Sequence, residues 1–551
     1  MSPAAVDPRH GAYHAADRTQ PVLACSTGDA LRQAAARDPQ GLALVEVVPE
    51  GWPSLVGAAR TDRTWTYAEL LAQAEQGAHW LLARFRPGDH LCLWAPNVPE
   101  WVVLQYAAAL AGMVLVTANP ALREDELRYV LRQSRAVALF HVPSFRGTDM
   151  AAMADALRGE VRLVCSLADW SRQVADAPRQ GPLPAVAPRD PAQLQYTSGT
   201  TGRPKGALLH HAGLVTNASF VARRLGLDRD VLVSPMPLFH TAGSVLSVLG
   251  ALATGSTLVL PLVFDPALVL DAVARWRGRV LFGVPTMLVA LLDAAARRPV
   301  DLSSLKVASS GGAPVPPELA RRVRDGLGCT LLAVYGQTET SPIISQTALS
   351  DSEADRTGTA GRPLWQVEVR IVDPASGRLQ PCRVEGEIQA RGYQTMLGYF
   401  DQPEETARTL LADGWLRTGD LGTLDERGYL RVTGRLKDMV IRGGENIYLA
   451  EVEACLMRHE AVANVAVFGL PDPHWGEVVA AAIEPRSGHP APQAEDLRAH
   501  CRAALAPHKT PVRWFVCRQW PLTGSGKVQK FRLQELAAAG ALDELAPAGI
   551  A

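Results

Sequence analysis

The sequence predicts an α/β protein with a large N-terminal domain of layered α/β subdomains and a small α+β domain at the C-terminus. Apolar strand-like runs alternate with amphipathic helical segments through most of the 551 residues, which is the pattern of layered α/β folds. From residue 365 to 430, short β runs alternate with Gly and Asp turns, which predicts a small β-barrel-like subdomain. A chain of this length is expected to divide into at least two domains.

The elements of the N-terminal domain follow from its hydrophobic pattern. A strand is predicted over 114–116 and a helix over 124–132. A strand over 280–284 ends where Pro285 opens a helix. The segment 172–191 is rich in Pro, Gln and Arg and has no hydrophobic period, so we interpret it as a linker.

The uncharged segment 244–264 is long enough to suggest a membrane span. Gly250 and Pro261 interrupt it, with a Thr-Gly-Ser run between them. A buried helix to about Ala253, followed by a strand over 257–260, is therefore expected in its place. No integral membrane association is predicted.

The domain division is predicted at the change of pattern after Gly434. The N-terminal domain is placed at 23–434 and the C-terminal domain at 435–551. The C-terminal domain is expected to contain a helix over 449–459, a strand over 461–469 and a helix over 493–505.

The composition excludes several classes of function. With 47% hydrophobic residues, 20% charged residues and a net charge of −1, the chain offers no basic footprint for nucleic acid or an anionic membrane. Its eight cysteines include no CxxC pair, which favours reduced thiols in a cytoplasmic enzyme over disulfides or a zinc site. The polar residues 1–22 lack the apolar core of a signal peptide and are expected to form a disordered tail.

The most informative segment is the loop over 196–206, which reads Tyr-Thr-Ser-Gly-Thr-Thr-Gly-Arg-Pro-Lys-Gly. Its glycines, hydroxyl side chains and lysine can surround a polyphosphate with hydrogen-bond donors and positive charge. The loop is not the Walker pattern, because no Gly-Lys-Ser/Thr ends it. A plain surface loop is the alternative, but the ordered run ending in Pro-Lys-Gly favours phosphate binding. The predicted phosphate-binding residues are Thr197, Ser198, Gly199, Thr200, Thr201, Gly202 and Lys205.

This loop resembles the signature of the adenylate-forming enzymes, which include acyl-CoA synthetases, adenylation domains and firefly-type luciferases. The resemblance covers about residues 25 to 535 and is greatest to medium-chain or general acyl-CoA synthetases. It implies a reaction in which a carboxylate attacks the α-phosphate of ATP and a thiol then displaces AMP from the acyl-adenylate. Further blocks occur in the family's order at 65–70, before this loop, and at 335–339, 418–420, 434–438, 443–446 and 526–527, after it.

The resemblance implies how ATP is held. Lys205 and the loop hydroxyls match groups on the β- and γ-phosphates, Thr338 matches a contact to the α-phosphate, and Glu339 matches the carboxylate that holds Mg²⁺. Tyr335 resembles the ring that stacks on adenine. Asp420 and Arg435 match the residues that bind the ribose. The remaining AMP-binding candidates are Gly311, Gly312, Ala313, Pro314, Gly336 and Gln337.

The resemblance also implies a mobile C-terminal domain. Lys527 looks like the catalytic lysine that bridges the carboxylate and the α-phosphate, and Lys437 occupies the hinge position. Rotation about the hinge is expected to replace Lys527 with one wall of a CoA tunnel, formed by Gly443, Gly444 and Glu445. In many relatives a proline that opens a helix stands where this chain has Leu449, a change expected to affect capping and not chemistry.

The segment 235–243 resembles the acyl-CoA synthetase block. His240 stands where amino-acid-activating relatives carry an aspartate, and it joins the catalytic candidates Lys527, Thr338 and Glu339 without a general-base role. The expected acyl pocket is small or apolar and offers nothing for a second carboxylate or an ammonium, so a medium-chain or bulky cyclic hydrophobic acid is expected. Its predicted residues are Phe239, His240, Ala242, Gly243, Ser244, Gly283 and Val284.

The leading interpretation is an ATP-dependent acid–CoA ligase that uses ATP, Mg²⁺ and CoA. One alternative keeps the adenylation step and loads a carrier-protein thiol, and another is a ligase specialised for one half-reaction. A third alternative, from a different class, is a non-catalytic protein that binds nucleotide or acyl-AMP. The oligomeric state stays open, a homodimer included.

Overall fold

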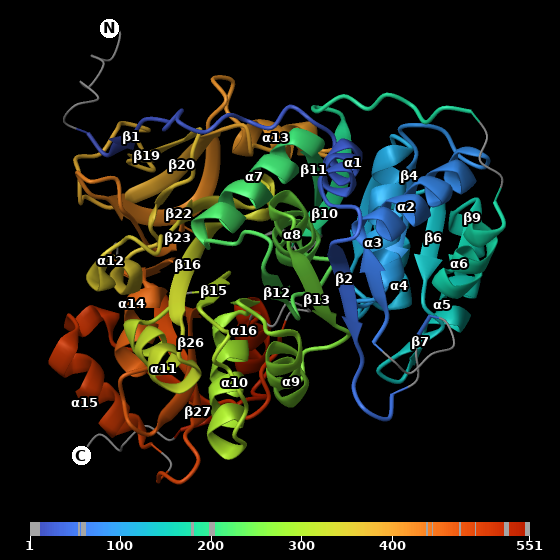
Figure 1. Cartoon of the computed structure of the whole chain (residues 1–551). Coiled ribbons are helices and arrows are strands. Elements are labelled where there is room, and N and C mark those ends of the chain that lie inside the picture. Colours follow the sequence, from blue (N-terminus) through green and yellow to red (C-terminus); the bar gives the residue numbers. More distant parts are fainter. Residues whose placement is uncertain are drawn as a thin grey trace, which may run out of the picture.

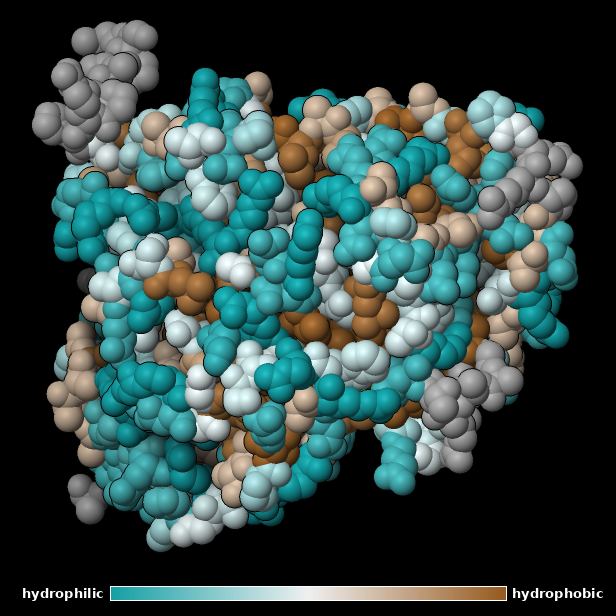
Figure 2. Space-filling view, in the orientation of Figure 1, coloured by the Kyte–Doolittle hydropathy of each residue, from teal (hydrophilic) through white to brown (hydrophobic). Residues whose placement is uncertain are grey.

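The computed structural model describes residues 11–52, 55–56, 62–177, 181–197, 204–313, 315–436, 439–442, 445–472, 475–490, 492–522 and 528–545. Its α/β architecture agrees with the sequence prediction. In Figure 1 a seven-stranded sheet lies at the right, a five-stranded antiparallel sheet at the upper left and the C-terminal unit at the lower left. On the face in Figure 2, hydrophobic side chains form small groups between hydrophilic ones.

The nine-stranded sheet has a parallel centre with antiparallel strands at both edges. Short apolar runs such as Val280–Phe282 form its parallel strands, because both faces of these strands are buried. In spatial order its strands are β18 (Arg362–Pro363), β17 (Ile343–Gln346), β16 (Thr330–Gly336), β15 (Val307–Gly311), β14 (Val280–Phe282), β12 (Val231–Val233), β13 (Thr257–Pro261), β2 (Leu42–Val47) and β3 (Thr64–Thr66).

In the seven-stranded sheet, the five strands from β10 to β9 are parallel. At the other edge β11 pairs antiparallel with β10, and β21 pairs antiparallel with β11. The strand predicted over 114–116 is β5 of this sheet. In spatial order its strands are β21 (Gly398–Tyr399), β11 (Lys205–His210), β10 (Pro191–Thr197), β5 (Val114–Ala118), β4 (His90–Trp94), β6 (Ala138–His141) and β9 (Leu163–Ser166).

Helices cover both faces of these sheets. Helix α7 contacts β11 of the seven-stranded sheet and β17 of the nine-stranded sheet, and α8 packs on α7 and on β13 of the nine-stranded sheet. Helices α9, α10 and α11 pack together on the nine-stranded sheet (Figure 1). The helices of the N-terminal region are α1 (Thr27–Arg37), α2 (Tyr67–Leu82), α3 (Pro99–Leu110), α4 (Glu124–Gln133), α5 (Met150–Ala156), α6 (Leu167–Ala175), α7 (His211–Arg224), α8 (Val248–Thr254), α9 (Pro266–Trp276), α10 (Pro285–Arg297), α11 (Pro317–Leu327), α12 (Glu353–Gly358) and α13 (Pro403–Thr409).

Two sequence predictions about this region are confirmed and one is wrong in part. The apolar segment 244–264 forms a π-helical turn η2 (Ala242–Ser247), helix α8 and strand β13. The helix predicted over 124–132 is α4. The predicted linker 172–191 overlaps α6, because the buried side chains of Trp170 and Val174 hold one side of that helix against the core.

Among the described residues, no helix combines the length and the apolarity that crossing a membrane requires.

The five-stranded sheet contains a segment that was predicted to be disordered. Strand β1 (Tyr13–His14) pairs with β19 (Val367–Val372), and the Tyr13 ring meets Trp415 edge-on at 6.4 Å between ring centroids. Residues 11–22, expected within a disordered tail, therefore include a strand, Tyr13–His14, that completes a sheet edge and places the Tyr13 ring against Trp415. The remaining strands of this sheet are β20 (Gly386–Gly392), β22 (Leu416–Leu424) and β23 (Leu430–Arg435).

The C-terminal unit has its own core on both sides of one sheet. Alternate residues of β27 (Gly476–Pro485) point to opposite faces, with Val479 and Ile483 on one face and Val478 on the other. The helix predicted over 449–459 is α14 (Leu449–Leu456), which begins at Leu449 as expected and ends three residues earlier. The other elements are β24 (Met439–Arg442), β25 (Glu445–Tyr448), β26 (Val462–Asp472), α15 (Ala494–Ala504), β28 (Arg513–Val516), α16 (Lys530–Ala538) and β29 (Asp543–Glu544).

The chain passes from the five-stranded sheet to the C-terminal sheet between β23, which ends at Arg435, and β24, which begins at Met439. The predicted boundary at 435 falls in this crossing. The division into 23–434 and 435–551 stays a proposal.

Candidate functional site

Neighbouring parallel strands of the nine-stranded sheet bring predicted site residues to one edge. Strand β16 ends at Tyr335 and Gly336, β15 ends at Gly311, and Gly283 directly follows β14. His240 lies in the connection that follows β12. Because the carboxyl ends of parallel strands meet at the same edge, these residues from distant parts of the sequence lie together.

Tyr335, Asp420 and Arg435 form a hydrogen-bonded group between two sheets. The Tyr335 hydroxyl donates to Oδ2 of Asp420 at 2.9 Å, and Nε of Arg435 donates to Oδ1 at 2.8 Å. Asp420 is only 4% exposed, and it lies opposite Arg435 in the β22–β23 ladder. Burial, and then the negative charge of Asp420, raise the pKa of Tyr335, so the phenol stays protonated and donates.

Two predicted glycines serve packing between strands. A Cβ atom on Gly336 would lie 2.0 Å from the carbonyl oxygen of Pro342, and one on Gly311 would lie 2.4 Å from that of Val334. Gly312 has φ of 76°, in the left-handed region that favours glycine. The resemblance made Gly311, Gly312 and Gly336 candidates for AMP binding, and that role stays a prediction. Neighbouring backbone already occupies the space where the side chains of Gly311 and Gly336 would lie.

The predicted phosphate loop connects β10 to β11, an antiparallel pair in which Thr197 lies opposite Lys205. The Thr197 hydroxyl donates to the Lys205 carbonyl at 3.5 Å, and the Tyr129 hydroxyl donates to the Pro204 carbonyl at 2.9 Å. These bonds fix the two ends of the loop. Ser198, Gly199, Thr200, Thr201 and Gly202 lie outside the described residues.

Glu339 and Lys205 are linked through Tyr399, which the sequence reasoning missed. Glu339 lies in the 3-10 turn after β16 and is 8% exposed, and its Oε1 accepts a hydrogen bond from the Tyr399 hydroxyl at 2.7 Å. The Lys205 ammonium lies 5.3 Å from the centre of the Tyr399 ring and is paired with Glu405. Burial and the nearby Glu339 raise the pKa of Tyr399. Gln337 and Thr338 are partly buried beside Glu339.

Three sheets therefore meet at one place. Glu339 follows a strand of the nine-stranded sheet, Tyr399 belongs to the seven-stranded sheet, and Asp420 belongs to the five-stranded sheet. The backbone N–H of Met396 adds a 2.9 Å hydrogen bond to the Glu339 carbonyl. Of the predicted nucleotide residues, Glu339 and Lys205 are joined here through Tyr399, and Tyr335, Asp420 and Arg435 are bonded together.

The segment after β12 joins the two large sheets. Asn97, which follows β4, donates from Nδ2 to the Met236 carbonyl at 3.1 Å and accepts from the Leu238 N–H at 2.9 Å. Nδ1 of His240 accepts from the Ala242 N–H at 3.3 Å, just before the π-helical turn. Such turns occur often at functional sites.

The predicted acyl-pocket residues divide into two groups. Gly243 and Ser244 are buried, and a Cβ atom on Gly243 would lie 2.2 Å from the Pro237 carbonyl oxygen. Gly283 is also buried. The residues that keep partial exposure are Phe239, His240, Ala242 and Val284.

A buried glutamine cluster, which the sequence reasoning missed, surrounds Ser244. Nε2 of Gln195 donates to the Ser244 hydroxyl at 3.2 Å, and Nε2 of Gln105 donates to the Ser244 carbonyl at 3.0 Å. Gln195 also accepts from the Thr117 hydroxyl at 2.9 Å. The signal in the sequence is the pair Gln193 and Gln195, two polar residues at alternate positions of a buried strand.

Several predicted residues lie outside the described parts of the chain: Pro314, Lys437, Gly443, Gly444 and Lys527. The backbone of Glu445 begins β25 and pairs with Arg442 of β24. Their roles stay predictions.

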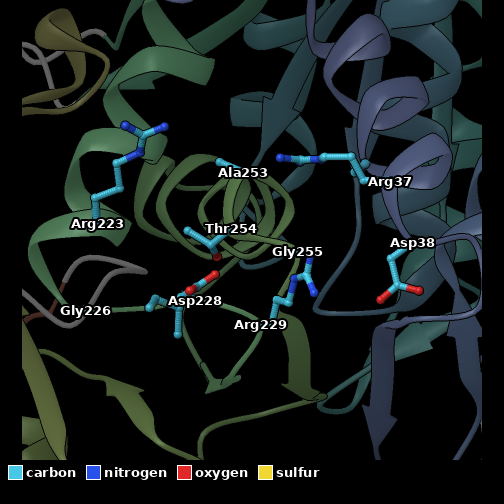
Figure 3. Close-up of a pocket in the computed structure, with 11 residues that line it drawn as sticks. Arg37, Asp38, Arg223, Gly226, Asp228, Arg229, Ala253, Thr254 and Gly255 are labelled. Atoms are coloured by element: carbon cyan, nitrogen blue, oxygen red, sulfur yellow. The ribbon is translucent and has the colours of Figure 1, made fainter. Parts of the chain in front are cut away.

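A surface pocket of about 460 Å³ lies at the C-terminal ends of α1, α7 and α8 (Figure 3). Its walls carry Arg37, Arg223 and Arg229, whose side chains lie apart and alternate with Asp38 and Asp228. None of the residues predicted for catalysis or binding lines it, so we assign it no role in the reaction.

Comparisons with known proteins identify the family of the chain. The family model "AMP-binding enzyme" matches residues 31–400, and "AMP-binding enzyme C-terminal domain" matches residues 451–527. The mitochondrial medium-chain acyl-CoA ligase ACSF2 of Mus musculus is 35% identical over 512 residues, covering 85% of this chain and 82% of that protein. The acyl-CoA ligase SID4 of Ajellomyces capsulatus is 36% identical over 512 residues, covering 86% and 87%.

Solved structures give the same result. ATP-bound MatB from Rhodopseudomonas palustris superposes with a TM-score of 0.82 at 29% identity, covering 92% of this chain and 98% of that one. The chain therefore belongs to the family of AMP-binding, adenylate-forming enzymes, and it is an acid–thiol ligase of the acyl-CoA synthetase type.

Proposed function

We propose that this ligase joins a hydrophobic acid, which carries no charged group besides its reacting carboxylate, to CoA through an acyl-adenylate. We propose that Mg²⁺ binds at Glu339. The observation that carries the proposal is the junction of three sheets, where Asp420, Tyr335 and Arg435 are bonded together and Tyr399 connects Glu339 to Lys205. Family membership supports the ATP-dependent chemistry. We propose the role of each residue and the chemical class of the acid.

The nucleoside is assigned to the Asp420 group. The Tyr335 ring provides a flat apolar surface for adenine, and the buried Asp420 carboxylate accepts hydrogen bonds from the ribose hydroxyls. Arg435 holds the Asp420 carboxylate in place at 2.8 Å and reaches the ribose from the same side. Gly311, Gly312 and Ala313 border this position at the end of β15.

The polyphosphate is assigned to Lys205, Thr197, Thr338 and the loop between β10 and β11. A carboxylate such as that of Glu339 suits Mg²⁺, which takes oxygen ligands and commonly binds through one or two carboxylates with phosphate oxygens. When bound, the ion neutralises charge that develops on the leaving pyrophosphate. Tyr399 keeps the Glu339 carboxylate oriented by donating to Oε1, and Lys205 supplies the second positive charge.

The exchange between the two half-reactions is assigned to the C-terminal domain. Lys527 is proposed to bridge the two reacting anions during adenylation, and rotation about Lys437 then brings Gly443, Gly444 and Glu445 to the thioester-forming position. These assignments rest on the resemblance of the motifs. The match of residues 451–527 to the C-terminal family model supports the presence of that domain.

The acid is proposed to be hydrophobic because the partly exposed residues of the predicted pocket include Phe239, Ala242 and Val284, which carry no charge. His240 is proposed to shape the mouth of this pocket. ACSF2 is named as a medium-chain ligase, which supports a medium-length acyl chain. A carrier-protein thiol is the alternative acceptor, and we retain a cytoplasmic location as a proposal.

The test is a panel of carboxylic acids incubated with the protein, ATP, Mg²⁺ and CoA. We expect carboxylate-dependent formation of AMP, and a CoA thioester of the expected mass for medium-chain or bulky cyclic acids. Release of AMP without thioester, together with acyl transfer to a carrier protein, would replace CoA with the carrier as acceptor. Preferential turnover of dicarboxylic or amino acids would contradict the assignment of a hydrophobic acid.

A further inference from the structure

The proposed phosphate-binding lysine already has an anionic partner. The Lys205 ammonium forms an ion pair with Oε2 of Glu405, a residue 200 positions further along the chain. The Lys205 side chain is 11% exposed and that of Glu405 is 24% exposed. The pair is therefore partly withdrawn from water, where charges interact more strongly than at an open surface.

The fold fixes Glu405 at this position. Strand β11 pairs with β21, with Ala207 opposite Tyr399, and α13 follows β21 directly. The Thr406 hydroxyl accepts a 2.9 Å hydrogen bond from the Tyr399 N–H, which holds the first turns of α13 against β21. The side chain of Glu405 is thus presented to Lys205 by ordered backbone.

Glu405 has a second cationic partner of its own. Nη1 of Arg408 donates to Oε1 of Glu405 at 2.5 Å, whereas Lys205 pairs with Oε2. Hydrogen bonds from Lys205 lower the pKa of Glu405, so the carboxylate is ionised at neutral pH. Because Arg408 binds the other oxygen, Glu405 keeps a charged partner when Lys205 is drawn away.

We propose that Glu405 exchanges with the polyphosphate as the counter-ion of Lys205. It holds the ammonium when the site has no nucleotide, gives it up to the β- and γ-phosphates of ATP, and takes it back when pyrophosphate leaves. This inference rests on the proposed role of Lys205 in phosphate binding. Glu405 is a positioning residue in this scheme, because it acts through Lys205.

The direction of the effect follows from charge. A carboxylate beside Lys205 competes with phosphate for the same ammonium, so the two anions exclude each other from it. Its presence therefore weakens the binding of ATP and of pyrophosphate and favours release of pyrophosphate before the thiol reacts. Removing its charge is expected to strengthen the binding of both.

The chain provides a matched control on the same helix. Glu404 is adjacent to Glu405, its side chain is 88% exposed, and it lies 3.8 Å from Arg408. The substitutions Glu405→Gln and Glu404→Gln remove the same charge with the same change of shape. A difference between the two variants therefore reports on the contact with Lys205 and not on net charge or helix propensity.

The test measures the inhibition constant of pyrophosphate and the KM for ATP in AMP formation. Glu405→Gln is expected to lower both constants about fivefold or more, whereas Glu404→Gln changes them by less than about twofold. The same two constants are then compared in Lys205→Gln and in Lys205→Gln/Glu405→Gln, where the effect of the Glu405 substitution should vanish. Unchanged or raised constants in Glu405→Gln would overturn the exchange.

The two proposals fail separately. If Lys205→Gln, folded by circular dichroism, binds pyrophosphate as the wild type does in calorimetry, the phosphate role of Lys205 is wrong and the exchange falls with it. If Lys205→Gln weakens pyrophosphate binding while Glu405→Gln behaves like Glu404→Gln, Lys205 keeps its role and the counter-ion exchange is wrong.

Discussion

The substitution Asp420→Asn tests the proposed ribose site most sharply. The carboxylate is 4% exposed and accepts from Tyr335 at 2.9 Å and from Arg435 at 2.8 Å, so its geometry is fixed before a nucleotide binds. An asparagine keeps the shape but offers one acceptor oxygen in place of two and carries no charge. At least one charge-assisted hydrogen bond to the ribose is therefore lost.

The magnitude follows from the strength of such a bond. A hydrogen bond to a charged group contributes about 1.5–3 kcal/mol, so ATP should bind about 10- to 150-fold more weakly to the variant. The assay is calorimetric titration of ATP into the folded variant, with urea unfolding run in parallel, because the substitution also removes the acceptor of either Tyr335 or Arg435. A matched control is Asp413→Asn, whose carboxylate is 57% exposed and 4.0 Å from Arg370.

The outcomes separate a binding role from a structural one. Weaker ATP binding in Asp420→Asn, with wild-type binding in Asp413→Asn, is the expected result. A folded Asp420→Asn protein that binds ATP within about twofold of the wild type would refute the assignment of the ribose to Asp420.

Three further substitutions test strand packing, the catalytic lysine and the CoA tunnel. Gly336→Ala should lower the free energy of unfolding by about 1–3 kcal/mol, because its Cβ would lie 2.0 Å from the Pro342 carbonyl oxygen. Gly283→Ala, whose Cβ would have its nearest neighbour at 3.4 Å, should change the free energy of unfolding less. Equal urea midpoints of the two variants would contradict this. Lys527→Ala should abolish carboxylate-dependent pyrophosphate release and largely spare thioester formation from supplied acyl-adenylate, and equal loss of both would remove its assigned role. Gly444→Trp should block thioester formation while acyl-adenylate accumulates; unimpaired CoA turnover would exclude the tunnel.

The sequence predicted the architecture well, because it depends on local signals; the roles of the nucleotide residues stay predictions. Short apolar runs mark buried parallel strands, and their polar or glycine-rich ends, such as those at Tyr335 and Gly311, lie at the sheet edge where ligands bind.

The family block at 65–70 contains the start of helix α2, which Thr66 caps. The Thr66 hydroxyl accepts from the Glu69 N–H at 3.2 Å, and Glu69 accepts from the Thr66 N–H at 2.8 Å.

The features that the sequence did not predict depend on contacts between distant segments. Tyr399 reaches Glu339, and Glu405 reaches Lys205, only because β21 adds to the edge of the seven-stranded sheet. The same applies to β1, whose two residues carry no strand pattern of their own and are ordered by pairing with β19. The packing function of Gly336 likewise depends on the position of a later turn.

The most direct test of the central claim is a crystal structure of the protein with a non-hydrolysable acyl-adenylate analogue. We predict that adenine lies against the Tyr335 ring, that the ribose hydroxyls lie within hydrogen-bond distance of Asp420, and that the acyl group extends toward His240. An analogue bound away from the junction of the three sheets, for example in the pocket beside Arg37 and Arg223, would contradict the account.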